Sequence, residues 1–139
     1  MLLKFSAYLK DEKVKKDFPD IPEAKGLMKN GIQDFETIKS SFKITETSAS
    51  IIFKDTYDAL RSVLQAFLSK EGYKPHSHEA IIAFNLENGN LTLPEANRFD
   101  KFRQLRNDIA YRAVRVTPEE ANEIQKLAEQ IIGKLKDKI

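Results

Sequence analysis

Several side chains that bind phosphate in proteins lie close together between Arg103 and Arg112. Arg106 and Asn107 are adjacent, and Arg103, Asn107 and Tyr111 follow at four-residue steps, which places these three on one face of a helix. Guanidinium and amide groups donate hydrogen bonds to phosphate oxygens. Tyr111 offers a phenol, and a phenol with its reference pKa of about 10 stays protonated at neutral pH. The pattern therefore indicates phosphate binding without an evident general base.

Positive charge extends along the sequence on both sides of this stretch. Between Arg98 and Val116, six arginines and lysines against two aspartates give a local charge of +4, whereas the whole chain carries +2. Such a stripe attracts polyanions, although a helix face that simply contacts solvent has the same pattern. The side chains expected to bind phosphate or RNA are Arg103, Arg106, Arg112 and Arg115.

Two further groups of residues have a chemical and a structural interpretation. His76 and His78 could contribute to a metal site, but a catalytic zinc usually has three protein ligands, and the chain has no cysteine. We therefore expect no metal and no cofactor, and we expect His78 to begin a helix. Asp55, Asp58 and Arg61 interrupt the long helix with charge. They form either a solvated helix face or a group in which the two acids order Arg106 or a basic group of a partner.

Composition limits the class of protein. The chain has 139 residues, 41% of them hydrophobic and 32% charged, which fits one folded domain over residues 1–139 with a short N-terminal extension at 1–19. No apolar run approaches the roughly 20 residues that span a bilayer. The apolar start of the chain is too short for a secretory signal, because charged residues follow it at once. Together with the absence of cysteine, this predicts a cytoplasmic protein without membrane contact.

Turn signals divide the chain into helices, and no segment shows the alternation typical of a strand. The first 15 or so residues are predicted to form a short helix, and the residues from Asp17 to Pro22 to end it. The next helix is predicted to continue to about Phe42, and the longest to run from about Ser48 to Lys70, where Gly72 supplies a left-handed cap.

Three more helices are predicted after Gly72. The first runs from about His78 to Asn85, the second opens at Thr92 and ends before Val116, and the last begins at Thr117 and Pro118. Short connections between helices favour an all-α fold, an antiparallel, up-and-down bundle of four to five helices. The expected core-facing residues of the helix that contains Arg106 are Phe99, Phe102, Leu105, Ile109, Ala113 and Val116.

The stretch from Arg103 to Arg112 resembles the Arg-Asn-x-x-x-His signature of HEPN domains, with Tyr111 where the signature has histidine. The resemblance covers roughly residues 20 to 139, since the long helix, the connection from Gly72 to Glu79 and the entry to the last helix also look HEPN-like. It implies a helical bundle of the kind found in prokaryotic toxin–antitoxin and RNA-processing systems. It also implies a homodimer in which the signature helices face each other.

The resemblance assigns Arg106, Asn107 and Tyr111 to the catalytic positions of HEPN ribonucleases. In those enzymes the histidine drives a metal-independent attack of a ribose 2′-hydroxyl on the adjacent phosphate, and the step needs an acid–base group with a pKa near neutrality. Loss of such a group typically costs about 10²–10⁴ in rate. HEPN branches that carry tyrosine at this position are similar to this chain and are commonly regarded as binding or partner proteins.

Three functions follow from these observations. We expect a noncatalytic or weakly active HEPN protein that binds RNA, nucleotide phosphate or a minimal nucleotidyltransferase partner. One alternative is a metal-independent endoribonuclease toxin with a degenerate motif, in which Tyr111 or an outside residue replaces the histidine. The other is a pure protein-interaction module whose basic stripe meets an acidic protein surface.

Overall fold

Six helices and one short pair of strands form the part of the chain that the computed structural model describes, residues 2–139. The prediction of an all-α bundle is confirmed, with one helix more than the four to five expected. No helix within the described residues is both long and apolar enough to cross a membrane. In chain order the elements are α1 (Phe5–Lys10), β1 (Val14–Lys16), α2 (Ile21–Ser41), α3 (Ala49–Glu71), β2 (Tyr73–Pro75), α4 (His78–Glu87), α5 (Leu93–Tyr111) and α6 (Pro118–Leu135).

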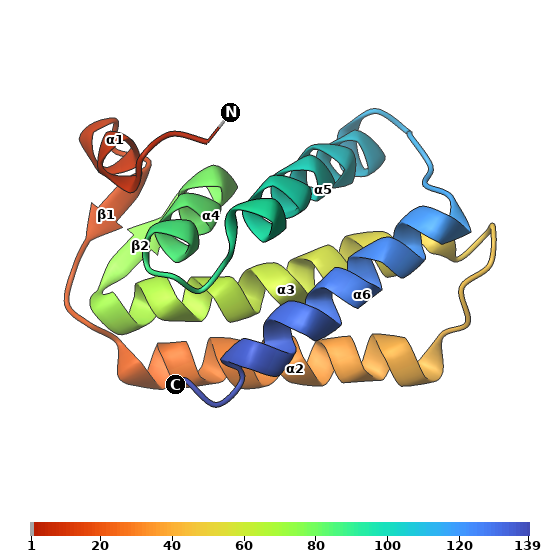
Figure 1. Cartoon of the computed structure of the whole chain (residues 1–139), viewed down its shortest axis with the longest axis horizontal. Helices are drawn as coiled ribbons and strands as arrows, with labels where there is room; N and C mark the ends of the chain where they lie inside the picture. The colour runs from red at the N-terminus through yellow and green to blue at the C-terminus, as the bar shows by residue number, and fades with distance from the viewer. Residues whose placement is uncertain (1) are drawn as a thin grey trace.

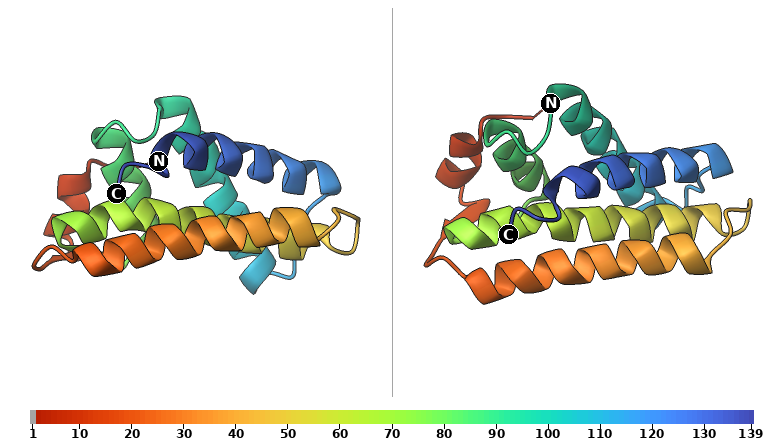
Figure 2. Two further views of the ribbon diagram at one scale, coloured as in Figure 1. Left: turned by 90° about the horizontal axis from the view of Figure 1, so that it is seen from below. Right: turned by 60° about the horizontal axis from the view of Figure 1, so that its bottom comes forward.

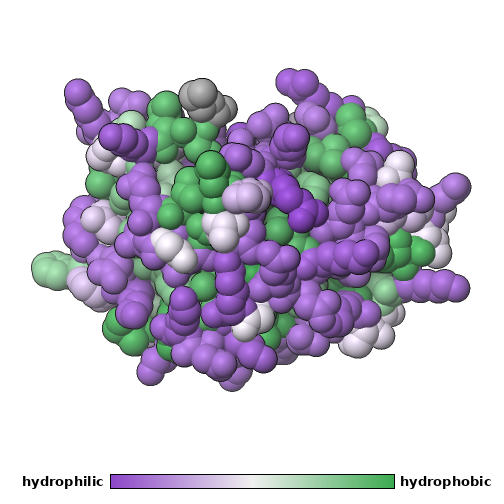
Figure 3. Space-filling view, in the orientation of Figure 1, coloured by the Kyte–Doolittle hydropathy of each residue, from purple (hydrophilic) through white to green (hydrophobic). Residues whose placement is uncertain are grey.

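The longest helix, α3, is the centre of the bundle. It packs against α2, α4, α5 and α6, and Figures 1 and 2 show α2 and α3 side by side along most of their length. Hydrophilic side chains cover most of the face seen in Figure 3, with small groups of hydrophobic ones between them. The apolar side chains that α3 turns to its neighbours are buried, among them Ala49, Ile52, Phe53, Leu60, Val63, Leu64 and Phe67.

Local signals set most of the helix ends. Asp20 caps the start of α2, because one of its carboxylate oxygens accepts a hydrogen bond from the amide of Glu23, the third helical residue. Gly72, with φ of 88°, ends α3 in the left-handed conformation. Thr92 and Thr117 each form a capping box that begins α5 and α6. The last three of these ends lie where the sequence predicts them, and Asp20 lies within the break predicted from Asp17 to Pro22.

The strands β1 and β2 contradict the prediction of a chain without strands. They pair antiparallel, with Val14 opposite Pro75 and Lys16 opposite Tyr73. Helix α1 ends at Lys10, earlier than predicted, because Glu12 takes a left-handed conformation with φ of 59° and the chain turns into β1. Each strand has only three residues, which is too short for alternation to be visible in the sequence.

The core face predicted for α5 is also wrong at one position, Ala113. Helix α5 ends at Tyr111 because Ala113 is left-handed, with φ of 56°, and is exposed, so the apolar stripe stops after Ile109. Val116 is buried, but as a loop residue whose amide donates to the hydroxyl of Ser50 at 2.9 Å. Phe42 is the C-cap of α2 and is 55% exposed, because the helix has ended before its ring can reach the core.

Candidate functional site

Helix α5 carries the motif residues, and its first half is anchored to α3 by aromatic packing. The Phe99 ring stacks on Tyr57 with ring centres 4.8 Å apart, and the Phe102 ring meets Phe53 edge-on at 5.4 Å. All four rings are buried. Such contacts fix the rotation of α5 about its axis and therefore decide which neighbouring element each polar side chain meets.

Arg106 lies against Asp58 of α3. Its Nε is 3.4 Å from Asp58 Oδ1, and a terminal nitrogen donates to Oδ2 at 3.4 Å. The Arg106 side chain is 19% exposed and the Asp58 side chain 34%. These distances exceed the 2.7–2.9 Å or so of a tight charge-assisted hydrogen bond. The carboxylate therefore orients the guanidinium loosely and leaves donors free for another anion. Of the two interpretations of Asp58, the ordering of Arg106 is the one that the contacts support.

Arg103 turns toward α4. Its Nε donates to Asp100 at 2.8 Å, and a terminal nitrogen lies 3.9 Å from Glu79, the second residue of α4. The side chain is largely buried. Arg103 therefore braces α5 against α4, and both of its acidic neighbours already compete for its charge.

The other motif residues lie on the outward face of α5. Asn107, Tyr111 and Arg112 line a shallow hollow of about 480 Å³ together with Gln104 and Asp108. The Tyr111 side chain is 80% exposed, and Arg112 Nε lies 3.8 Å from Asp108. Tyr111 is five residues after Arg106, which on a helix of 3.6 residues per turn puts the two about 140° apart. One chain therefore does not direct the phenol and the Arg106 guanidinium at the same point.

Arg115 belongs to neither of these groups. It lies in the loop after α5 and donates to the carbonyl oxygen of Thr47 at 2.9 Å. The predicted phosphate-binding residues therefore divide into an inner pair, Arg103 and Arg106, an outer residue, Arg112, and the loop residue Arg115.

His78 also lies near this site, although the sequence predicted only a structural role for it, at the start of a helix. As predicted, it begins α4, and its Nδ1 lies 3.2 Å from the hydroxyl of the buried Tyr57. Burial lowers the pKa of His78 to about 4, and the nearby charges of Arg61 and Arg106 contribute to that fall. The imidazole is therefore neutral at pH 7. No sequence pattern marks this contact, because it joins residues 21 positions apart on different helices.

A groove of about 520 Å³ lies between α2 and α3 and includes Asp58. Asp34 of α2, Asp55 and Arg61 also line it. Burial raises the pKa of Asp55, and the charges of Asp58 and Asp34 add to that rise while Lys54 and Arg106 oppose it. Acidic side chains thus come from both helices of the groove, and Arg61 of α3 supplies positive charge beside them.

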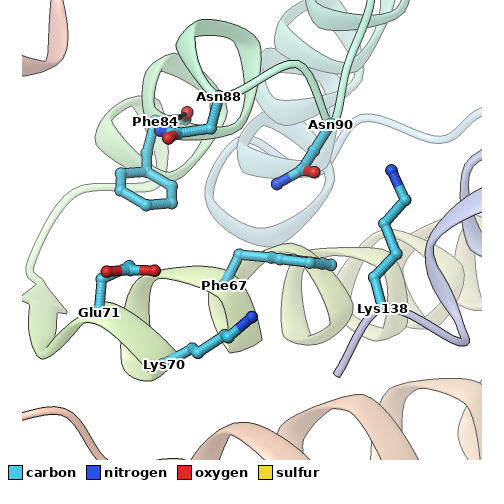
Figure 4. Close-up of a pocket in the computed structure, with 7 residues that line it drawn as sticks. All are labelled: Phe67, Lys70, Glu71, Phe84, Asn88, Asn90 and Lys138. Atoms are coloured by element: carbon cyan, nitrogen blue, oxygen red, sulfur yellow. Dashed lines mark hydrogen bonds between the residues drawn. The ribbon is translucent and has the colours of Figure 1, made fainter.

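A third hollow, of about 220 Å³, lies away from the motif. Figure 4 shows Phe67, Lys70 and Glu71 of α3 on one side, Asn88 and Asn90 on the other, and Lys138 from the C-terminal segment. None of the predicted site residues lines it. Within residues 2–139, no three histidine, aspartate or glutamate side chains are grouped as a metal site requires.

The fold and the site define an all-α bundle protein with an arginine–asparagine pair on a long helix. A protein-family model described as "HEPN domain" matches residues 24–138, so the chain belongs to the HEPN domain family. The resemblance of the stretch from Arg103 to Arg112 is therefore confirmed at the level of the family. A search of curated proteins and a search of solved structures each found no match.

Proposed function

We propose that this HEPN protein binds the phosphate groups of RNA or of a nucleotide through Arg106 and does not cleave them. The observation that carries the proposal is the loose pairing of a largely buried guanidinium with Asp58 at 3.4 Å. A largely buried arginine held by a distant carboxylate can exchange that partner for a phosphate oxygen, to which it binds in bidentate fashion.

The position of Tyr111 supports the noncatalytic part of the proposal. The side chain is exposed and points to a different side of α5 from Arg106. Transfer of the 2′-hydroxyl proton needs a base within hydrogen-bond reach of the bound phosphate diester. The motif of one chain supplies the cation for the phosphate and no such base.

We also propose that the protein is a homodimer whose α5 helices face each other. None of the residues from 103 to 115 is fully buried, and the apolar Leu105 and Ile109 pack against the core but remain only half-buried. A second copy packed on this face would cover both side chains and bring two basic helices together. Light scattering should give twice the chain mass of 15.9 kDa. Ala110→Arg, which places a bulky charge on the exposed face of α5, should return the mass to that of one chain.

Fluorescence anisotropy with a labelled single-stranded RNA of mixed sequence tests the proposed binding. Affinity should fall as salt rises, because each phosphate contact releases condensed counterions. Arg106→Ala should weaken binding about tenfold, whereas Lys101→Ala, which removes an exposed charge from the same helix, should change it little. Equal affinity at low and high salt contradicts the proposal.

A nucleotidyltransferase partner is the alternative that this experiment separates. If an acidic nucleotidyltransferase co-purifies and RNA is not retained at low salt, the basic face of α5 binds protein instead. The discriminating variant is again Arg106→Ala. If the chain is a protein-interaction module, this variant should weaken the complex with the protein partner, and neither the variant nor the wild type should bind RNA.

A further inference from the structure

Arg61 of α3 lies close to the motif and lacks an acidic partner among the described residues. Arg103 and Arg106 each lie within 4.0 Å of a carboxylate, and no such contact exists for Arg61 among the described residues. One terminal nitrogen of Arg61 is 3.4 Å from Gln65 Oε1, and its buried Nε has no hydrogen-bond partner within residues 2–139. A buried donor without a partner is unfavourable, and a bound anion would satisfy it.

The His78 ring is held in a fixed position near the same turn of α3. Its Nδ1 meets the Tyr57 hydroxyl at 3.2 Å, and Tyr57 is in turn fixed by stacking on Phe99. Burial raises the pKa of Tyr57, so the hydroxyl keeps its proton. When that hydroxyl donates to Nδ1, the neutral ring carries its proton on Nε2. The Nε2–H group is then a donor with no protein partner in the described part of the chain.

The contacts bring these groups together from three helices. Tyr57, Asp58 and Arg61 occupy little more than one turn of α3. Tyr57 contacts His78 of α4, and Asp58 contacts Arg106 of α5. The charges of Arg61 and Arg106 both act on His78 and disfavour its protonated form. Two guanidinium groups and one neutral imidazole therefore lie near one another beside α3.

We propose that Arg61 and His78 complete the phosphate site that begins at Arg106. A phosphate group bound there accepts hydrogen bonds from both guanidinium groups and from His78 Nε2–H. The groove between α2 and α3 gives access, because Arg61 and Asp58 both line it. The acidic side chains of Asp34 on α2 and Asp55 on α3 disfavour an anion in the rest of this groove. This inference rests on the proposed function and names further residues of the same site.

Binding of the labelled RNA to single variants tests the inference. Arg61→Gln and His78→Gln should each weaken binding about tenfold, as a lost charge-assisted or polar contact to phosphate does. His76→Gln is the matched control for His78, because His76 is exposed and two residues away. Arg106→Gln is measured beside Arg61→Gln and His78→Gln. If Arg106→Gln is the only one of the three that weakens binding, the inference is wrong and the proposed function stands. If all three variants bind like the wild type, both are wrong.

The wild-type protein gives a second test that does not depend on how the variants fold. The chain has two histidines, so their imidazole resonances are readily assigned by comparison with His76→Gln. Addition of the RNA at neutral pH should shift the Hε1 and Nε2 signals of His78 and leave those of His76 in place. Unmoved His78 signals with the RNA bound overturn the inference.

Discussion

Arg106 and Asp58 lie on different helices, 48 residues apart in the chain, and their side chains meet at 3.4 Å. The pair links the HEPN motif on α5 to the central helix α3. The same carboxylate that positions Arg106 also competes with any phosphate for its guanidinium. Stability and anion affinity should therefore respond to Asp58 in opposite directions.

Asp58→Asn should lower the free energy of unfolding by about 1 kcal/mol, because a largely buried guanidinium loses its partner. The same variant should bind RNA more tightly, since the competing negative charge is gone. Chemical denaturation and fluorescence anisotropy measure the two effects on one preparation. Asp55→Asn is the control, because Asp55 lines the same groove without an ion pair in the described structure and its ionised form is already disfavoured. Unchanged or weaker RNA binding in Asp58→Asn would indicate a purely structural role for the pair.

The wild-type protein should leave RNA intact in the presence of EDTA, because its motif carries Tyr111 in place of the acid–base histidine. Tyr111→His introduces an imidazole at the motif position. In the proposed homodimer, whose α5 helices face each other, the imidazole of one copy can reach the phosphate held by Arg106 of the other, so this variant should produce cleavage that Arg106→Ala abolishes, since a positioned acid–base group contributes about 10²–10⁴ in rate. Gel analysis of an end-labelled RNA after incubation with each variant provides the measurement. Cleavage by the wild type that depends on Arg106 would reverse the choice between binding protein and ribonuclease.

Close packing of α2 on α3 depends on one glycine. A Cβ at Gly31 would lie 2.7 Å from both the carbonyl oxygen of Ala59 and a methyl group of Val63. Gly31→Ala should therefore destabilise the protein by about 1–3 kcal/mol, as overpacking does. Gly26 lies on the same helix, and a Cβ there would meet no neighbouring atom within 4 Å, so Gly26→Ala should stabilise the protein by about 0.5–1 kcal/mol through helix propensity. Thermal unfolding of the two variants beside the wild type measures both effects. Midpoint temperatures that shift in the same direction in both variants would contradict this account.

The helices of the bundle could be predicted because their signals are local. Asp20, Gly72, Thr92 and Thr117 each satisfy or end the backbone hydrogen bonds of the adjoining turn, and the neighbouring sequence is sufficient to show it. The end of α5 was less predictable. An alanine rather than a glycine takes the left-handed conformation at position 113, so the usual marker of a helix end is missing.

The site was predictable only in part, because its geometry is tertiary. Four-residue spacing places Arg103, Asn107 and Tyr111 near one another on α5, but the sequence does not show which neighbours draw Arg103 and Arg106 inward. Glu79 and Asp58, on two other helices, do so. The contact between Tyr57 and His78 has the same character. Such pairings depend on how α4 and α5 rest on α3, which no spacing rule encodes.

Acid should destabilise the protein through His78. Its pKa is about 4 in the folded chain, below the value of about 6.5 of an unhindered imidazole in the unfolded chain. Between these values the unfolded state binds more protons than the folded state, so the free energy of unfolding should fall as pH drops from about 6.5 to 4. Urea denaturation at a series of pH values measures this slope. His78→Gln retains a hydrogen-bonding group and does not titrate there, so its slope should be shallower. Equal slopes for the wild type and His78→Gln would mean that carboxylates alone account for the acid sensitivity.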